Sequence, residues 1–487
     1  MDTPTRRLPR IAQAAIVIAI GTLGGAKLPE IEHFDEIILG GGKGGKSLAL
    51  ALAPAGHRVA LVERKFIGGS CINVACIPTK TMVASAKLVD QAKHAGDFGV
   101  ALSPAGPSLK SIIERKRRVV AGMVDTHKNL FANTPNLTFI AGEGAFTSAN
   151  EIAVNLADGS TRHLSGDRIF INTGSRTAIP QVKGLSEIPY LTSTSIMELE
   201  ELPEHLVIVG GGYIALEFSQ IFRRLGSKVT VLLRGDRFLP REDEDIAALV
   251  KQVLEEDGIE FRANAKIDSV ANKTPQSISI SLGDGQGDLL CSHLLLAIGR
   301  TSNTENIGLE KVGIEIDAHA NIKVNEYLET NVPNVWALGD CNGGPLFTHV
   351  SWDDYRIARD RILHDIKRST TNRLVPYTLF IDPELGRVGL TETEARKRGL
   401  DILVAKLPAN KIPRAMTSGE PKGLLKAVVD RNSKQILGCS LFCHSAGEVM
   451  SVVQMAMLGK LTYADVRDTV FTHPTMAESL NLLFATI

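Results

Sequence analysis

The chain repeats one glycine-rich pattern, and this repeat limits the folds open to it more than any other feature. Residues 37–45, with Gly40, Gly42 and Gly45, recur as residues 207–215, with Gly210 and Gly212. Each copy follows a short apolar, β-branched run, opens a helical stretch and leads into a second apolar run. This order of strand, glycine turn, helix and strand brings the backbone close to a pyrophosphate at a helix N-terminus. We therefore predict an α/β fold with two dinucleotide-binding domains.

The first copy also fits a phosphate-binding P-loop, because Lys46 and Ser47 follow Gly45. However, Glu63 ends the next predicted strand, where a dinucleotide fold places its ribose-binding carboxylate. A P-loop explains neither Glu63 nor the cysteine pair that follows. We favour the dinucleotide interpretation over a phosphotransferase.

Two cysteines stand shortly after the first pattern, in the run Gly-Gly-Ser-Cys71-Ile-Asn-Val-Ala-Cys76-Ile-Pro-Thr-Lys. Two thiols this close in sequence can open and close one disulfide, and the thiolate is the attacking species. The alternative, a pair of buried structural cysteines, is disfavoured by the flanking glycine and Ile-Pro-Thr-Lys segments. We predict that Cys71 and Cys76 form a redox-active pair next to a redox cofactor.

Composition excludes several other classes of function. A chain of 487 residues suggests two to four domains, and its formal net charge of +0 indicates neither a nucleic-acid nor an anionic-membrane partner. The remaining cysteines do not form a secreted disulfide framework, and no metal-ligand set is predicted. We expect a reducing, cytoplasmic location and packing roles for Cys291, Cys341, Cys439 and Cys443.

The N-terminal 33 residues have a different character. Arg6, Arg7 and Arg10 precede an apolar run over residues 11–23 that is short for a membrane span. The arrangement is similar to a signal peptide, with a hint of twin-arginine export. We favour a cytoplasmic extension or a mis-assigned start and keep export as the alternative; no membrane partner is expected.

The cysteine segment resembles the active-site helix of the pyridine nucleotide-disulfide oxidoreductases, and similar motifs run from about Asp35 to the end of the chain. Residues 238–243, 353–356 and 471–478 most resemble the group of reactive-chlorine-resistance flavoproteins (RclA) and mercuric reductases. The resemblance implies two Rossmann-type domains and a C-terminal α+β dimerisation domain. The predicted bounds are 34–174 with 298–370 for the FAD domain, 175–297 for the NAD(P)H domain and 371–487 for the dimerisation domain, after the extension 1–33.

This resemblance also implies the chemistry. Hydride passes from the nicotinamide to FAD, and electrons then reach the disulfide; Cys76 faces the flavin and Cys71 meets the substrate. Lys80 lies by the flavin and pairs with Glu217. The implied cofactor-binding residues are Gly40, Gly42, Gly45, Glu63, Ser70, Lys80, Ala145, Gly174, Asp340, Gly210, Gly212, Glu217, Arg234, Arg237 and Gly299.

A second catalytic pair is expected near the C-terminus, where His473 precedes Glu478. A histidine held by a carboxylate acts as a general acid-base near neutral pH. The resemblance implies that this pair reaches the active site of the other subunit, so the enzyme is a homodimer with shared sites.

The second glycine unit departs from the NADH pattern. The position equivalent to Glu63 is Leu233, which cannot bind ribose hydroxyls, and Arg234 follows it. An arginine there suits a 2′-phosphate, and Arg237 and Arg241 could add charge. The sequence therefore favours NADPH over NADH.

The electron acceptor is the least defined feature. No cysteine follows Cys443 and no N-terminal C-x-x-C is present, in contrast to mercuric reductases, so efficient mercury reduction is not favoured. We expect a small-molecule or metal-ion substrate: a metal ion such as Cu(II) or Hg(II), or an oxidised thiol. The alternatives are an enzyme like dihydrolipoamide dehydrogenase, which Arg234 disfavours, and a redox-sensing flavoprotein with little turnover.

Overall fold

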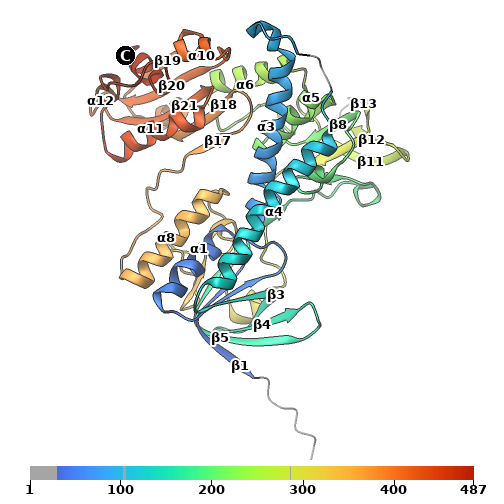
Figure 1. Ribbon diagram of the computed structural model, residues 1–487, viewed down its shortest axis with the longest axis vertical. Coiled ribbons are helices and arrows are strands. Elements are labelled where there is room, and N and C mark those ends of the chain that lie inside the picture. Colours follow the sequence, from blue (N-terminus) through green and yellow to red (C-terminus); the bar gives the residue numbers. More distant parts are fainter. Residues whose placement is uncertain (1–29, 103–105, 284, 286) are drawn as a thin grey trace, which may run out of the picture.

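A computed structural model describes residues 30–102, 106–283, 285 and 287–487 (Figure 1). The signal-like segment predicted from the sequence, residues 11–23, lies outside the described residues. Three sheet-containing units are visible in Figure 1: one around β1 at the bottom, one around β8 at the upper right and the C-terminal unit at the upper left.

The first unit is built on a parallel sheet with the order β3-β2-β1-β5-β16, closed on one side by the antiparallel strand β4. Helices α1 and α8 cover one face, where their apolar side chains pack with those of the sheet. The elements are β1 (Ile31–Leu39), β2 (Val59–Glu63), β3 (Leu137–Ser148), β4 (Glu151–Leu156), β5 (Thr161–Ile171), β16 (Val335–Ala337), α1 (Lys43–Leu52) and α8 (Thr348–His364).

Strand β1 begins earlier than the sequence suggested. Residues 31–34 pair with residues 163–166 of β5, and Phe34 is fully buried. The sequence placed the start of the unit near Asp35, where the resemblance to the family begins. The neighbouring strand extends β1, and Phe34 anchors it in the core.

The second unit repeats the first. Strand β8 leads through a glycine turn into α5 and then β9, as β1 leads through α1 into β2, and its parallel sheet has the order β10-β9-β8-β14-β7. The predicted repeat is therefore present as two β-α-β units. The elements are β7 (Leu191–Thr192), β8 (His205–Val209), α5 (Tyr213–Leu225), β9 (Lys228–Leu232), α6 (Glu244–Glu256), β10 (Glu260–Arg262) and β14 (His293–Leu296).

Smaller elements complete this half. A three-stranded antiparallel sheet covers one side of the second unit, and a two-stranded pair joins the two units. These strands are β11 (Ile267–Thr274), β12 (Ser277–Leu282) and β13 (Gly287–Cys291), and β6 (Ser175–Thr177) with β15 (Arg300–Ser302). The short helix α7 (Leu309–Val312) lies against β3.

The C-terminal unit is an antiparallel sheet with the order β17-β18-β21-β20-β19, on which α11 packs. Its elements are β17 (Tyr377–Leu379), β18 (Glu384–Gly389), α9 (Glu392–Lys397), β19 (Ile402–Pro408), α10 (Pro413–Thr417), β20 (Leu424–Asp430), β21 (Ile436–Cys443), α11 (Ala446–Leu458), α12 (Tyr463–Arg467) and α13 (Ser479–Phe484). Cys439 and Cys443 both lie in β21 and are buried, as are Cys291 and Cys341. The predicted fold class is confirmed, while the residue bounds of the domains stay a prediction.

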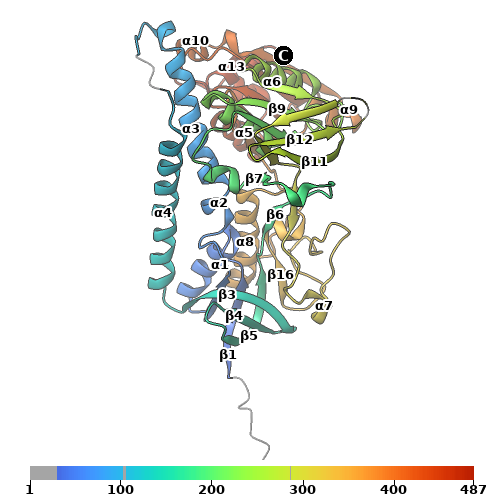
Figure 2. The same ribbon diagram turned by 90° about the vertical axis from the view of Figure 1, so that its right-hand side faces the viewer.

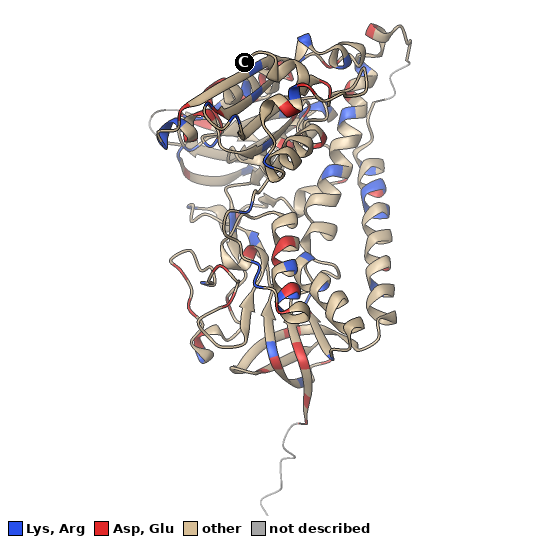
Figure 3. Cartoon of the chain, turned by 90° about the vertical axis from the view of Figure 1, so that its left-hand side faces the viewer, with Lys and Arg blue, Asp and Glu red and all other residues tan. Residues whose placement is uncertain are grey.

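Two long helices run beside these units. Figure 2 shows α3 (Cys76–Lys93) and α4 (Leu109–Asn133) along one side of the molecule, from the first unit toward the C-terminal one. Acidic and basic residues are interspersed over the chain, in keeping with its zero net charge (Figure 3). Within the described ranges, every helix is too short or too polar to cross a membrane.

Candidate active site

The first glycine turn is shaped by close backbone contacts. Gly40 has φ +105°, and a Cβ there would lie 2.2 Å from the carbonyl oxygen of Asn172. The Asn172 side chain accepts from the Gly45 amide at 2.8 Å and donates to the Leu338 carbonyl at 2.7 Å. These contacts leave the N-terminus of α1 open toward the carboxyl end of the sheet, the position of a bound pyrophosphate in this type of fold.

The end of β2 supplies the acidic group predicted for a ribose. Glu63 accepts a hydrogen bond from the Gly41 amide at 2.8 Å, and its other oxygen accepts from the amides of Lys65 and Phe66. The carboxylate is thus fixed beside the turn. This cradle of glycines, helix N-terminus and carboxylate fits the adenosine diphosphate part of FAD.

The second glycine turn repeats this shape without the carboxylate. Gly210 has φ +119°, and a Cβ there would lie 2.4 Å from the carbonyl oxygen of Ala297. Leu233 occupies the place of Glu63 and is 5% exposed, with its side chain against Gly211. Arg234 and Arg237 are exposed, and neither forms an ion pair with a carboxylate of the described residues.

A continuous cleft joins the two turns. Its wall includes Ser70, both cysteines and the arginines after β9. Of the predicted site residues, the cleft is lined by Gly42, Glu63, Ser70, Cys71, Cys76, Lys80, Gly174, Gly210, Gly212, Glu217, Arg234, Arg237, Gly299 and Asp340. The structure therefore brings most of the predicted cofactor-binding residues to one cavity.

The two cysteines stand on either side of a break in the helix. Cys71 lies in the short helix α2 (Ser70–Asn73), and Cys76 is the first residue of α3. Ala75, between them, has non-helical φ −138° and ψ −107°. In a continuous helix, at about 100° per residue, residues five apart point to nearly opposite sides of the axis. The break allows the two thiols to meet.

The two thiols have opposite acid-base behaviour. A hydrogen bond from Cys71 lowers the pKa of Cys76 to about 6, against the effect of burial; a contact with Thr348 and the charge of Lys80 also lower it. The Cys76 sulfur lies 3.3 Å from the Thr348 hydroxyl. The same hydrogen bond raises the pKa of Cys71, and burial adds to this. In the dithiol form, Cys76 is the thiolate and Cys71 carries the proton.

Lys80 and Glu217 form the predicted ion pair. The Lys80 ammonium lies 2.7 and 2.8 Å from the two carboxylate oxygens, and also 4.6 Å from the centre of the Phe380 ring. Glu217 is 4% exposed and also accepts from the Phe380 amide at 3.1 Å. The pair joins the helix of Cys76 to the helix of the second glycine turn.

The C-terminal acid-base pair is formed but lies elsewhere. His473 Nδ1 is 2.9 Å from both oxygens of Glu478, and the His473 side chain is 66% exposed. Neither residue lines the cleft of its own chain. Within one chain the structure does not bring this pair to the cysteines.

Of two further predicted cofactor-binding residues, Asp340 lies at the cleft and Ala145 does not. Asp340 accepts a hydrogen bond from Ser175 at 2.5 Å at the edge of the cleft. Ala145 pairs with Ala153 across β3 and β4 and does not line the cleft, so the structure does not place it with the other cofactor-binding residues. A motif match cannot locate such a strand residue, because it carries no distinctive chemistry.

Sequence analysis missed Asn172 and Thr348 as site residues. Asn172 was visible only as part of a motif segment, and Thr348 lies 272 residues from the thiol it contacts. No local pattern signals such contacts. Lys46 was considered only for a P-loop, but its amine turns away from the cleft toward Gly68 and His127.

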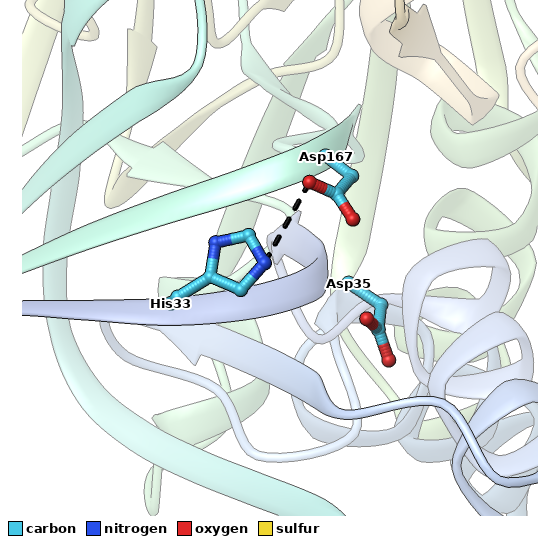
Figure 4. A group of neighbouring side chains, drawn as sticks. All are labelled: His33, Asp35 and Asp167. Atoms are coloured by element: carbon cyan, nitrogen blue, oxygen red, sulfur yellow. Dashed lines mark ion pairs between the residues drawn. The ribbon is translucent and has the colours of Figure 1, made fainter.

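A separate polar group lies at the start of β1, at the opposite end of this strand from the glycine turn. His33, Asp35 and Asp167 have potential metal-ligating atoms within 4.8 Å of one another, and Figure 4 shows the His33 ring turned toward Asp167. His33 Nε2 lies 3.6 Å from the Asp167 carboxylate. His33 and Asp167 are exposed and Asp35 is half-buried, and the contact between His33 and Asp167 joins β1 to β5.

Comparison with known proteins supports this interpretation. The profile of the pyridine nucleotide-disulphide oxidoreductase family matches residues 34–354, and the profile of the dimerisation domain of that family matches residues 375–483. The chain is 40% identical over 461 residues to the probable pyridine nucleotide-disulfide oxidoreductase RclA of Escherichia coli, covering 94% of this chain and 100% of the relative. It is 30% identical to the mercuric reductase of Lysinibacillus sphaericus, covering 96% of this chain and 85% of that protein.

A solved structure shows the same architecture. The Cu(II) complex of the HOCl-induced flavoprotein disulfide reductase RclA from Escherichia coli superposes with a TM-score of 0.87 at 39% identity, covering 93% of this chain and 99% of that one. The predicted family and its RclA-like group are thereby confirmed.

Proposed function

The chain belongs to the pyridine nucleotide-disulphide oxidoreductases, and on this premise we propose that it is an FAD-dependent NADPH reductase whose Cys71–Cys76 pair reduces a metal ion or an oxidised thiol. FAD bound at the first glycine turn would supply two-electron transfer between nicotinamide and cysteines. The observation that carries the proposal is the cleft that holds both glycine turns and both thiols.

The thiols have complementary roles toward an oxidised thiol. Cys71, once deprotonated, attacks one sulfur of the acceptor disulfide, forming a mixed disulfide and releasing one thiolate. The Cys76 thiolate then attacks the Cys71 sulfur, which closes the Cys71–Cys76 disulfide and releases the second thiolate. The acceptor gains two electrons and the dithiol loses two.

A metal acceptor needs the same two electrons. With Cys76 as the thiolate, oxidation of the dithiol to the disulfide reduces two Cu(II) ions to two Cu(I), or one Hg(II) ion to Hg(0), and releases one proton, that of Cys71. Soft thiolate ligands favour such ions. A solved relative is a Cu(II) complex and another relative is a mercuric reductase, which makes both ions reasonable test acceptors for this chain.

NADPH is the proposed donor because of the residues after β9. The buried Leu233 offers no oxygen to ribose hydroxyls, and Arg234 and Arg237 line the cleft. Arginine suits a phosphate through charge-assisted, bidentate hydrogen bonds. An enzyme like dihydrolipoamide dehydrogenase, which was the alternative, would need a different group at this position.

We also propose a cytoplasmic homodimer in which His473 and Glu478 serve the cysteines of the other subunit. The matched dimerisation domain and the outward-facing His473–Glu478 pair support this arrangement. Light scattering of the purified chain would test the dimer, and fractionation of cells that express the full chain would test the location. A monomer would contradict the proposed homodimer, and a chain recovered outside the cytoplasm would contradict the proposed location.

The acceptor is best tested with a panel of compounds. Purified, flavin-loaded protein is given NADPH or NADH together with Cu(II), Hg(II), a small disulfide, lipoamide or oxygen, and nucleotide oxidation is followed. The Cys71→Ser variant is measured in parallel. It should retain FAD and lose turnover with the metal and disulfide acceptors, while slow oxygen reduction persists. Turnover of these acceptors at the wild-type rate in Cys71→Ser would overturn the mechanism, and no turnover in the wild type would favour a redox-sensing role.

A further inference from the structure

A tight turn follows the arginines after β9. The Glu242 amide donates to the Leu239 carbonyl at 2.9 Å, so Pro240 and Arg241 form the middle of the turn. Leu239 has φ 43°, in the left-handed region that leucine rarely adopts, and its side chain is buried in the apolar core. The surrounding structure therefore imposes this conformation, and such strain is typical of functional sites.

Arg241, in the middle of this turn, lines the cleft together with Arg234 and Arg237. All three residues are exposed, and no carboxylate within the described ranges forms an ion pair with any of them. Three such guanidinium groups on one short stretch suit an anion with several acceptor oxygens. The 2′-phosphate of NADPH is an anion of this kind.

The backbone of Arg241 is held from the C-terminal unit. Arg387, a buried residue of β18, donates from Nη1 to the Arg241 carbonyl at 2.6 Å. The same nitrogen donates to the Tyr377 hydroxyl at 3.0 Å, and Nη2 lies 2.6 Å from the Glu394 carboxylate. One guanidinium group thus links the turn of the nucleotide unit to β17 and α9.

The next residue of the turn, Glu242, depends on the same arginine. The Tyr377 hydroxyl donates to the Glu242 carboxylate, and Arg387 Nη1 lies 3.5 Å from it. Glu242 is 4% exposed, and its second oxygen is buried without a hydrogen-bond partner in the described part of the chain. A buried carboxylate that loses its cation is strongly unfavourable. Removing the Arg387 charge should therefore displace the turn as well as free the Arg241 carbonyl.

A second contact anchors the residue after the turn. Asp243 accepts from the amides of Glu392 and Thr393, at the start of α9, at 3.0 and 2.9 Å, and lies 2.9 Å from the Lys426 ammonium. Helix α6, which begins after Asp243, lies beside the C-terminal unit (Figure 1). This contact fixes the segment as a whole, whereas the Arg387 contacts act on the turn itself.

We propose that Arg387 is a positioning residue for nucleotide choice, which holds the turn at residues 239–242 so that Arg241 meets the 2′-phosphate. Arg387 does not itself line the cleft, so it acts through Arg241. The inference rests on the proposed function in taking NADPH as the donor. It adds that the C-terminal unit of the same chain sets the preference for this nucleotide.

The test measures nucleotide binding without turnover. Flavin-loaded, oxidised protein is titrated with NADP⁺ and with NAD⁺ by calorimetry at one fixed ionic strength. Arg387→Met should weaken NADP⁺ binding by about tenfold and change NAD⁺ binding by less than about twofold, because only NADP⁺ carries the phosphate that a displaced Arg241 would lose. Arg241→Ala should show the same pattern.

A double variant tests whether Arg387 acts through Arg241. If it does, Arg387→Met should cause no further loss of NADP⁺ affinity in an Arg241→Ala background. Two independent contributions would instead multiply, and such a result would overturn the proposal.

A matched control separates positioning from loss of stability. Arg224 is another buried arginine that joins the nucleotide unit to the C-terminal unit, since its Nη1 lies 2.7 Å from Asp382. Arg224→Met should lower the melting temperature and leave the ratio of NADP⁺ to NAD⁺ affinity unchanged.

A milder variant covers the case in which Arg387→Met does not fold. Tyr377→Phe keeps the ring, whose centre lies 5.2 Å from that of Tyr213, and removes only the hydroxyl that donates to Glu242. It should weaken NADP⁺ binding by about threefold relative to NAD⁺, because one of the two partners of Glu242 is lost. An unchanged ratio in Tyr377→Phe would then overturn the proposal.

The outcomes distinguish this inference from the proposed function. A wild type that prefers NADP⁺, with an Arg387→Met variant that keeps the preference, refutes the inference alone, as does an equal change of the ratio in Arg224→Met. A wild type without the preference refutes NADPH as the proposed donor, and the inference with it. A ratio that depends on Arg387, in a protein that turns over no acceptor, refutes the proposed reductase activity alone.

Discussion

Lys80 and Glu217, 137 residues apart in sequence, are joined by two hydrogen bonds of 2.7 and 2.8 Å. The contact fixes the helix that starts at Cys76 against the helix that starts at the second glycine turn. The ion pair thus sets both the geometry between the two nucleotide units and the charge near the thiolate.

Removing the Lys80 charge should affect both properties. Lys80→Met leaves the buried Glu217 carboxylate without its partner, and we expect the free energy of unfolding to fall by about 1–3 kcal/mol. This is less than for a fully buried ion pair, because the Lys80 side chain is partly exposed. The pKa of Cys76 should rise, since Lys80 lowers it. Thermal melting and alkylation of Cys76 measure the two effects. Lys87→Met, which breaks another ion pair of α3, should lower the melting temperature without moving the Cys76 profile.

The hydroxyl of Thr348 should tune the thiolate of Cys76. The Cys76 pKa of about 6 lies below that of a free thiol, so the thiolate predominates above pH 6 and is lost as the pH falls through that value. In a Cys71→Ser background, Thr348→Val should raise the alkylation midpoint of Cys76 by about one unit, because a charge-assisted hydrogen bond is lost. Thr348→Ser keeps the donor and should behave as wild type; identical profiles for the valine and serine variants would show that the contact is passive.

Nucleotide choice should depend on the residues after β9. A contact between Arg234 and a 2′-phosphate is worth about 1.5–3 kcal/mol, so Arg234→Ala should lower kcat/KM for NADPH by roughly ten- to a hundredfold and leave NADH nearly unchanged. Leu233→Glu should restore a carboxylate like Glu63 and raise NADH use. Both nucleotides are measured at one fixed ionic strength, because salt screens the contact. Equal losses for both nucleotides in Arg234→Ala would show that this arginine is only a surface charge.

The start of β1 should matter for stability. A protein beginning at Glu30 keeps the pairs between residues 31–34 and β5, the His33–Asp167 contact and the buried Phe34. It should fold, bind FAD and retain activity. A protein beginning at Asp35 loses the Phe34 side chain, worth about 3–5 kcal/mol. Its melting temperature and flavin content should both fall; equal values for the two proteins would show that this part of β1 is dispensable.

The sequence predicted those parts of the site that short sequence motifs encode. The two glycine turns, the cysteine segment and Glu63 rest on short-range geometry, and each lies at the cleft or beside it. Lys80 with Glu217 was predicted from resemblance alone. Thr348 and the Lys46–His127 contact were not predicted, because they arise only when α8 and α4 pack against α1 and α3. The first residues of β1 were missed because the resemblance begins only near Asp35, while pairing with β5 extends the strand back to Ile31.

The break between α2 and α3 has a consequence for how electron transfer can be lost. The two sulfurs can approach only because the chain departs from helical geometry at Val74 and Ala75, two residues that have no redox chemistry themselves. A change that extended one regular helix through them would turn the thiols apart and leave both fully intact. A thiol titration of such a protein would still detect both thiols, but the protein could not form the disulfide that stores an electron pair. Turnover therefore depends on the backbone torsion angles of Val74 and Ala75 as well as on the two sulfurs.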